Sequence, residues 1–565
     1  MKKIINATAI LALFFTSCQN FVKNEDDNNL DSLSAHHAYS VRDMSITAEN
    51  AYSDLFIDST ALENYVTKEK LDDSTSRSLR KFYAMRNLQY AWFSSHGLTE
   101  QGRSFWYLFN YGNKEQKNDS LLKQLDTLAM SPDTTALNAS DSSLVQLELM
   151  LTKHFIQYQQ KEKDNAVFAS LKHPVPVKKM DVMQLADSIL KEKDTVQYQN
   201  NKAYTALKQH LNTYYTVAQS GGWKPVSLGA KQLKKGVKSP EIVAIKKRLQ
   251  LTGDYAANDS TNVFSDSLEA AIRVYQQLNG LKADGVITDS LVQVMNVPVE
   301  KRIEQILINL NRMAWAPAQT AENYIVVNVP DFMLNVYEAG KLTQTMEVIV
   351  GKEGTNTLMF KGDLNQIVFS PYWNIPQSIV QNEIIPAMKS DPNYLKKKNM
   401  EIVKQNDSIP QIRQLPGKEN ALGKVKFLFP NNFDIFLHDT PDKTLFNKKN
   451  RALSHGCIRV ANAELLAQYL LKDQKEWTPE KIKAAMNAGK EQHVKINRTV
   501  PVQITYYTAW VDDAGKLRFG SDIYGHDQET ARMMFTSYNN QNPGITPRTD
   551  SLKRKDTSTA KRKTA

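Results

Sequence analysis

At roughly 150 residues per domain, a chain of 565 residues suggests three to four domains. It carries 71 Lys and Arg against 60 Asp and Glu, a formal charge of +11, with 41% apolar and 23% charged residues. These values exclude a wholly disordered chain, a collagen-like chain and a polytopic membrane protein, and two cysteines exclude a disulfide scaffold or a multi-cysteine metal site. The positive charge is compatible with cell wall or nucleic acid as a partner and does not choose between them.

The first residues are typical of a secretory signal. Lys2 and Lys3 form a basic start, residues 10–15 form an apolar run too short to span a bilayer, and small residues precede Cys18. Residues 15–18, Phe-Thr-Ser-Cys, resemble a bacterial lipobox, which implies that Cys18 is the lipidated first residue of the mature chain; simple secretion is the alternative. We therefore expect a signal peptide over residues 1–18 and a polar tether over residues 19–45.

Helical periodicity dominates the next part of the chain, and we expect a helical scaffold domain over residues 46–235. Its most distinctive patch runs from Phe82 to Thr99 and includes Arg86 and Trp92. As physics alone, this patch predicts an amphipathic helix whose aromatic face is buried. No His/Cys/Asp cluster with metal-ligand spacing occurs in this domain.

A compact unit follows over residues 236–298. The spacing of apolar residues predicts helices over residues 241–251 and 265–278, and a Gly-Leu-x-x-Asp-Gly turn leads into a short helix over residues 288–295. This order resembles the small three-helix peptidoglycan-binding domain, and an unrelated three-helix bundle is the alternative. A further amphipathic helix, residues 300–313, occupies a linker that we place at residues 299–321.

From Tyr324 the apolar period changes from 3.6 to 2, which predicts short strands joined by turns and hence a β-sandwich or barrel. The expected strands are residues 324–329, 333–337, 345–350, 367–369, 426–429, 434–437, 493–496, 502–508 and 517–519, with a helix over residues 463–471. An insertion of about residues 372–424 is too long for an ordinary loop. We interpret it as a lid that excludes water, with a helix capped by Ser378; a decorative insertion remote from the site is the alternative.

The residues with the richest chemistry surround Cys457, the only thiol left if Cys18 carries lipid. His438 ends an expected strand, Gly456 permits a tight bend, and Arg459 shares the strand face of Cys457. A nearby His or Arg lowers the pKa of a thiol, and an imidazole can take its proton. The pattern favours a nucleophilic thiolate. Zinc bound by His438, His455 and Cys457, or a purely structural cysteine, are the alternatives.

The segment from His438 to Arg459, His-x15-Ser-His-Gly-Cys-x-Arg, resembles the signature of the L,D-transpeptidases, the YkuD-type catalytic domain. With the scaffold, the peptidoglycan-binding unit and the long insertion, the layout resembles the large multi-domain Gram-negative subgroup. The resemblance implies a multi-domain α+β fold: a helical N-terminal scaffold, a three-helix peptidoglycan-binding domain and a mostly-β sandwich catalytic domain over residues 322–528. Residues 529–565 would form a C-terminal region that ends in a basic disordered tail.

The resemblance also implies a two-step acyl transfer without metal or organic cofactor. Cys457 would attack the bond before D-Ala in a tetrapeptide stem, and the side-chain amine of a diamino acid would resolve the thioester into a 3→3 cross-link. His438 matches the general base, oriented by a backbone carbonyl near Asp439, which stands where many short members carry Gly or Ser. The oxyanion region is matched by His455, Gly456 and Cys457. Arg451 and Arg459 match positions that hold the loop or a stem carboxylate, and Tyr372 and Trp373 are candidate stem contacts.

Other functions stay open at this point. A hydrolase on the same site, an L,D-carboxypeptidase or endopeptidase, would use water as acceptor. A non-catalytic lipid-anchored protein would tether the membrane to the wall. The resemblance implies peptidoglycan stems and glycan as partners, no nucleic acid, a monomer, and covalent acylation of Cys457 by carbapenems. By bacterial analogy, Gln19 favours the periplasmic face of the outer membrane, whereas the acidic residues 25–27 are compatible with surface export.

Overall fold

The computed structural model describes residues 42–112, 125, 128, 137–161, 175–192, 201–229, 232–316, 321–405, 409–431 and 433–536. The expected signal peptide, Cys18, most of the tether and the basic tail lie outside these residues. Within the described ranges, no helix combines the length and the apolar character needed to cross a membrane.

The N-terminal part is helical, as expected. Its helices are α2 (Ser59–Lys68), α3 (Asp73–Ala84), α4 (Glu100–Gly112), α6 (Ser142–Lys161), α7 (Val182–Lys191) and α9 (Lys202–Gln219), with a small hairpin of β1 (Phe93–Ser94) and β2 (Gly97–Leu98). Aspartates at the N-caps of α2, α3 and α7 accept hydrogen bonds from the first free backbone N–H groups. Tyr83 and Trp92 are buried, which confirms the predicted burial of the aromatic face. The predicted helix over this patch is wrong, because α3 ends at Ala84 and the β1–β2 hairpin occupies the end of the patch.

The peptidoglycan-binding-like unit matches its predicted elements closely. Helices α10 (Pro240–Leu251), α11 (Asp266–Leu278) and α12 (Asp289–Met295) pack with the short strands β3 (Gln232–Leu233) and β4 (Ile287–Thr288). Ser265 caps α11 through its side chain, so the helix begins one residue later than expected. The unit has an apolar core of its own.

One nine-stranded sheet forms the third part. Its strands are β5 (Tyr324–Asn328), β6 (Met333–Glu338), β7 (Lys341–Gly351), β8 (Phe360–Phe369), β12 (Val425–Leu428), β13 (Leu437–His438), β14 (Ala452–Ser454), β15 (Ile458–Val460) and β16 (Gln492–Thr505). They pair in the order β14-β7-β15-β13-β12-β8-β16-β5-β6, and β6 also pairs with β7. The sheet therefore curls until β6 pairs with β7, which leaves β14 as an extra edge strand. Of the two expected forms, a sandwich or a barrel, the structure has the closed sheet of a barrel. Helices α17 (Ala463–Leu471) and α18 (Pro479–Met486) lie beside it.

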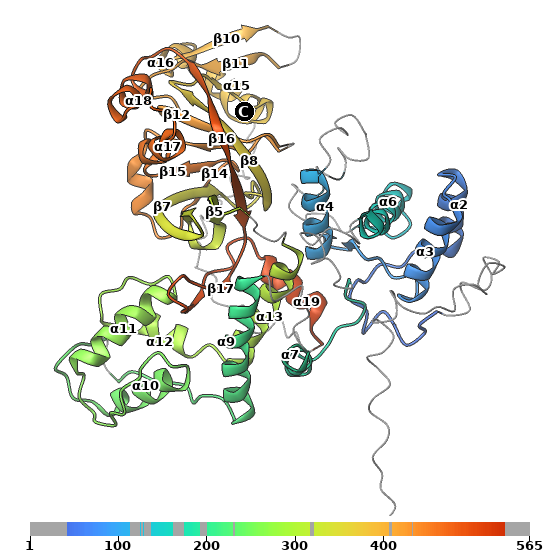
Figure 1. Ribbon diagram of the computed structural model, residues 1–565, viewed down its shortest axis with the longest axis vertical. Helices are drawn as coiled ribbons and strands as arrows, with labels where there is room; N and C mark the ends of the chain where they lie inside the picture. Colours follow the sequence, from blue (N-terminus) through green and yellow to red (C-terminus); the bar gives the residue numbers. More distant parts are fainter. Residues whose placement is uncertain are drawn as a thin grey trace, which may run out of the picture.

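Helix α13 (Val299–Trp315) connects these parts and packs against α9, α7 and α4 of the scaffold and against α19 (His526–Met534) near the C-terminus (Figure 1). A single apolar cluster runs from the scaffold through α13 into the closed sheet. Scaffold and sheet therefore share one core, whereas the peptidoglycan-binding-like unit keeps a separate one.

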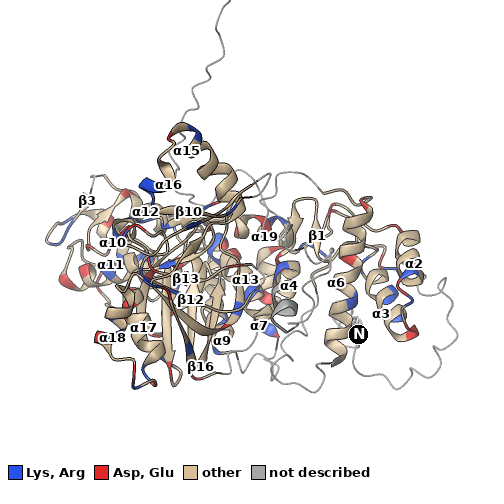
Figure 2. Cartoon of the chain, turned by 90° about the horizontal axis from the view of Figure 1, so that it is seen from above, with Lys and Arg blue, Asp and Glu red and all other residues tan. Residues whose placement is uncertain are grey.

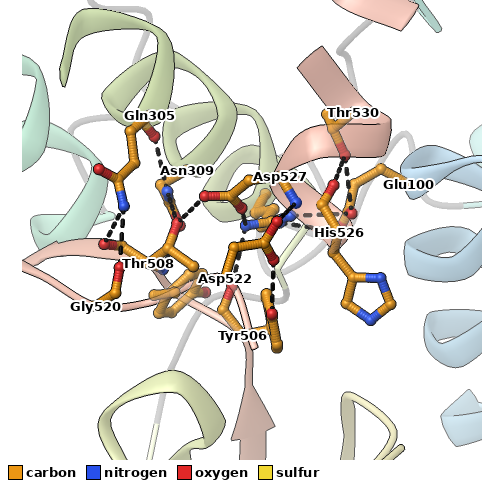
Figure 3. A network of polar contacts seen from close by, with 12 residues as sticks. Glu100, Gln305, Asn309, Tyr506, Thr508, Gly520, Asp522, His526, Asp527 and Thr530 are labelled. Carbon is orange, nitrogen blue, oxygen red and sulfur yellow. Dashed lines mark hydrogen bonds and ion pairs between the residues drawn. The ribbon is translucent and has the colours of Figure 1, made fainter. Parts of the chain in front are cut away.

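A buried polar network reinforces the junction around α13 (Figure 3). Arg312 lies between Glu100 of α4, at 3.2 Å from Nε to Oε1, and Asp527 of α19, at 2.5 Å from Nη1 to Oδ1. Asn309 pairs with Thr508, whose hydroxyl donates to Asp527 Oδ2 at 2.6 Å. These contacts tie three segments that are far apart in the sequence to one helix.

Several strand expectations are wrong. The strands expected at residues 493–496 and 502–508 are one strand, β16, which ends at Thr505. Residues 434–436 do not belong to a strand, because Asp434 adopts a left-handed backbone with φ +53°, and β13 begins only at Leu437. Residues 517–519 form β18 (Leu517–Phe519), which pairs with β17 (Ala509–Val511) in a separate two-stranded sheet instead of extending the large one.

The insertion between β8 and β12 folds as a unit with a small apolar core. It contains α14 (Gln377–Ile379), the π-helical turn η7 (Val380–Ile384), α15 (Ile385–Ser390), α16 (Tyr394–Lys397) and a sheet of β9 (Trp373–Asn374), β10 (Met400–Lys404) and β11 (Gln411–Gln414). Ser378 lies inside α14 and Pro376 is the N-cap, so the predicted cap is wrong. Helix α16 is rich in lysine (Figure 2).

Candidate active site

Two adjacent parallel strands position the candidate catalytic residues. Strands β13 and β15 pair so that Leu437 lies opposite Ile458 and His438 opposite Arg459. Leu437 and Ile458 are fully buried in the shared core, so His438 and Arg459 point to the other face of the sheet. Cys457 directly precedes β15, and its sulfur interacts electrostatically with Arg459. Arg459 also interacts with the His438 ring, so this arginine lies close to both candidate catalytic side chains.

The ring of His438 is fixed by its own backbone surroundings. Nδ1 lies 2.5 Å from the carbonyl oxygen of Asp439, which confirms the expected orienting carbonyl and leaves Nε2 as the acceptor nitrogen. Burial, followed by the charge of Arg459, lowers the pKa of His438 to about 3. The imidazole is therefore neutral over the whole physiological pH range, and its burial makes it a weak base.

The carboxylate of Asp439 binds two lysine residues and not the His438 ring. It pairs with Lys443 at 2.6 Å and accepts the N–H of Lys424 at 2.9 Å. The Asp439 side chain is buried. Neither of these two contacts is with the imidazole of His438. Asp439 acts on His438 mainly through its backbone carbonyl and stabilises the turn that follows β13.

The thiol of Cys457 differs from the expectation of a lowered pKa. Sγ donates to the carbonyl oxygen of Asp434 at 3.6 Å, and the residue is half-buried. Burial raises the pKa of Cys457 to about 11, and this outweighs the lowering by a backbone hydrogen bond from Phe436 and by Arg459. The resting site therefore holds a neutral thiol and a neutral imidazole, and attack of the sulfur on a carbonyl requires proton transfer during the reaction.

The turn before Cys457 presents backbone donors. Gly456 has φ +113°, a conformation that a side chain would strain. Its N–H donates to Ser454 Oγ at 3.1 Å, and the Ser454 hydroxyl donates to the Cys457 carbonyl at 2.6 Å. Among the described residues, the N–H groups of His455 and Cys457 have no hydrogen-bond acceptor. These two groups, and not that of Gly456, are the available donors for an oxyanion.

The two arginines have different surroundings. Arg451 contacts the carbonyls of Val348 and Phe332 at 3.2 and 3.1 Å and the carboxylate of Glu347 at 3.2 Å, which fits the loop-holding role expected for it. Arg459 lies beside Cys457, and its buried Nε has no hydrogen-bond partner in the described part of the chain. Arg459 is therefore the arginine placed to meet a substrate carboxylate or an anionic sulfur.

The insertion reaches the site through His455. Its Nε2 lies 3.0 Å from Oε1 of Glu383, which belongs to the π-helical turn η7. Tyr372 stacks under the guanidinium of Arg413, 4.2 Å from Cζ to the ring centre. Trp373 packs on the apolar core of the insertion and so supports this unit.

The zinc alternative finds no support in this geometry. Across the described ranges, no three His, Cys, Asp or Glu side chains are arranged to hold a metal ion. His455 faces Glu383, while the Nδ1 atom of His438 is bonded to a backbone carbonyl. The three residues are better suited to acid–base and nucleophilic chemistry.

We expect alkylation of Cys457 by iodoacetamide to be slow at neutral pH and to rise until about pH 11. A Cys18→Ser protein, in which Cys457 is the only thiol, serves for the measurement. A pKa of about 11 against the ordinary 9.0 corresponds to about 100-fold less thiolate near pH 8. A half-titration at pH 7 or below would instead mean that the thiol is already ionised at rest.

Comparison with known proteins relates this sheet to one family. Residues 322–504 match the profile described as "L,D-transpeptidase catalytic domain". These residues are therefore similar to the L,D-transpeptidase catalytic domain. The match covers every strand of the closed sheet except the last residue of β16 and includes both His438 and Cys457.

Two further profiles match outside the transpeptidase domain. Residues 77–211 match "Scaffold domain" and residues 238–295 match "Putative peptidoglycan binding domain". A Haemophilus influenzae protein described as "Putative L,D-transpeptidase" is 33% identical over 254 residues, which cover 42% of this chain and 51% of the relative. The matched region thus spans about half the length of that relative.

Solved structures with the same description are more distant. An L,D-transpeptidase from Mycobacterium smegmatis is 13% identical with a TM-score of 0.19, covering 33% of this chain and 59% of that one. The L,D-transpeptidase from Stackebrandtia nassauensis is 14% identical with a TM-score of 0.22, covering 49% and 97%. The similarity of residues 322–504 to this family therefore comes from the sequence match.

Proposed function

We propose that this transpeptidase domain forms 3→3 peptidoglycan cross-links by acyl transfer through Cys457. The proposal is carried by one observation: within the matched catalytic domain, an arginine lies close to both a lone thiol and a neutral imidazole, beside two unpaired N–H groups. The match to a peptidoglycan-binding domain supports peptidoglycan as the substrate.

In the first step the thiol turns from the Asp434 carbonyl toward Nε2 of His438. The imidazole takes the proton as sulfur attacks the carbonyl before D-Ala, so the S–C bond forms and the carbonyl electron pair moves to oxygen. The N–H groups of Cys457 and His455 are the candidate donors to that oxygen. As the C–N bond breaks, imidazolium returns its proton to the nitrogen of D-Ala, which leaves a thioester.

In the second step the side-chain amine of a neighbouring stem attacks the thioester. The amine gives a proton to His438, the new C–N bond forms, and the C–S bond breaks with sulfur leaving as thiolate. The thiolate then recovers the proton from the imidazolium. No redox partner is required, and the enzyme returns to its neutral pair.

The insertion favours transfer over hydrolysis. Its contact between Glu383 and His455 brings a folded unit against the turn that carries Cys457. A cover of this kind lowers the access of water to a thioester, whereas an amine held by the substrate-binding face still reaches it. The L,D-carboxypeptidase or endopeptidase reading predicts the opposite preference.

Mass spectrometry of products from purified tetrapeptide stems tests the proposal. We expect cross-linked dimers together with free D-Ala, and a trap of the thioester at Cys457. Trimmed monomers alone would show a hydrolase. No product, with retained binding to insoluble peptidoglycan, would support the wall-tethering protein.

We also propose that the chain is a cell-envelope lipoprotein anchored at Cys18, on the periplasmic face of the outer membrane. The support is the lipobox-like sequence before Cys18 and the peptidoglycan substrate that this location supplies. Labelled fatty acid incorporated into the wild type but not into Cys18→Ala is the expected result. Equal labelling of both proteins would overturn the anchor.

A further inference from the structure

Thr357, in the loop after β7, and Tyr524, near the C-terminus, meet behind the turn that carries Cys457. The hydroxyl of Thr357 donates to the carbonyl oxygen of Gly456 at 2.7 Å. The backbone N–H of Thr357 donates to the Tyr524 hydroxyl oxygen at 3.2 Å, and that hydroxyl donates to the Gly351 carbonyl at 2.6 Å. Thr357 is buried, so these bonds are shielded from water.

Tyr524 comes from outside the matched catalytic domain, which ends at residue 504. It is held in place by Tyr506: the two rings stack with centres 5.5 Å apart, and the N–H of Tyr524 donates to the Tyr506 hydroxyl oxygen at 2.9 Å. Tyr506 in turn donates to Asp522, within the polar network around α13 (Figure 3). Tyr506 thus holds both the backbone N–H and the ring of Tyr524 in place.

The bond from Thr357 has a geometric consequence for catalysis. The Gly456 carbonyl and the Cys457 N–H belong to one planar trans peptide group, in which C=O and N–H point in opposite directions. A donor that holds the carbonyl on one side therefore aims the N–H to the other side. Among the described residues, the Cys457 N–H has no hydrogen-bond acceptor. Its direction is therefore set through the carbonyl of the same peptide group and not by a hydrogen bond that the N–H itself donates.

We propose that Thr357 and Tyr524 are positioning residues, which hold the Gly456 carbonyl so that the Cys457 N–H faces the oxygen of the attacked substrate carbonyl. The inference rests on the proposed acyl transfer. Neither residue touches the substrate. Thr357 sets the peptide plane, and Tyr524 fixes Thr357 by bridging its N–H to Gly351 at the end of β7.

Two reactions of the same sulfur separate this role from general support. Acylation by a carbapenem develops an oxyanion, whereas alkylation by iodoacetamide at a saturated carbon develops none. For Thr357→Val and Tyr524→Phe we expect the acylation rate to fall by at least about ten-fold. The fall should be smaller than the loss of about 10²–10³-fold that follows removal of an oxyanion-hole donor itself. Alkylation should keep the wild-type rate, and Thr357→Ser, which retains the hydroxyl, should acylate like the wild type.

Tyr337→Phe is the matched control, since it removes a tyrosine hydroxyl that bonds Asp513 at 3.2 Å far from the thiol. Its acylation and alkylation should both equal those of the wild type. Equal acylation rates for Tyr524→Phe, Thr357→Val and the wild type would overturn the positioning role of Thr357 and Tyr524 but leave the proposed acyl transfer untouched. A parallel fall of acylation and alkylation would also overturn this role, because the turn itself would have moved. Failure of the wild type to acylate would instead overturn the proposed function and the inference with it.

Discussion

Cys457→Ser is expected to lose cross-linking activity by more than about 10³-fold, because removal of a nucleophile leaves only the catalysis due to binding and the oxyanion donors. A serine hydroxyl is a much weaker acid than a thiol, and the neutral imidazole of His438 is a weak base with a pKa of about 3. The substitution removes no packing volume of note at a half-buried position. Product formation from tetrapeptide stems, followed by mass spectrometry, measures the loss.

Binding to insoluble peptidoglycan provides the matched readout for this variant. The peptidoglycan-binding-like unit has its own apolar core, so Cys457→Ser should bind the wall as the wild type does. Thermal unfolding should also be unchanged. If the serine protein still forms cross-links or fully replaces the wild type in cells, the thiol mechanism is wrong and adhesion becomes the better description.

Arg312→Met is expected to lower the free energy of unfolding by about 3–5 kcal/mol, the usual cost of removing one partner from a buried ion pair. Arg312 is buried between Glu100 and Asp527, and the variant leaves both carboxylates without a cation. Burial already raises the pKa of the neighbouring Asp522 to about 7. Chemical denaturation at pH 8 measures the effect.

The pH dependence of this loss has a definite sign. Burial and the nearby Asp527 raise the pKa of Asp522 and Arg312 opposes this rise, so without Arg312 the folded chain holds the Asp522 proton more readily than the unfolded chain does. The folded state is then favoured at low pH and loses stability as pH rises. Arg312→Met should therefore be closer to the wild type at pH 5 than at pH 8. Adding Asp527→Asn should restore part of the stability, since it removes one uncompensated charge.

Arg498→Met is the control, because Arg498 and Asp473 form an exposed pair at 3.4 Å. Pairs of this kind contribute about 0–1 kcal/mol. An Arg312→Met protein no less stable than this control would contradict the view that the junction around α13 depends on its buried charges.

Local patterns predicted the helices and most strands well. The helix at residues 463–471 has the expected bounds, and α11 differs by its cap residue alone. Strand β8 begins at Phe360, earlier than expected. Its first half was not predicted because only one face is buried there, and polar residues such as Lys361 and Asp363 occupy the other face. Left-handed residues such as Asp434 also escaped prediction, since nothing in the neighbouring sequence requires them.

The candidate site was predictable where it lies in one stretch of sequence. The motif around Cys457 predicted the candidate nucleophile, and the candidate base His438 followed from its strand end. The raised thiol pKa was not predictable, because burial in the folded chain outweighs the neighbouring arginine. Thr357, Glu383 and Tyr524 reach the turn from distant segments and carry no local signal, so only the fold reveals them.

The insertion enters and leaves the closed sheet at neighbouring positions, since Phe369 at the end of β8 lies opposite Val425 at the start of β12. In topological terms it is an overgrown hairpin loop, and its interior is packed independently of the barrel. Its length and sequence can therefore diverge during evolution without shifting the register that aligns His438 with Arg459. Replacement of the whole insertion by a short turn between Phe369 and Val425 should therefore leave the pairing of β13 with β15 unchanged.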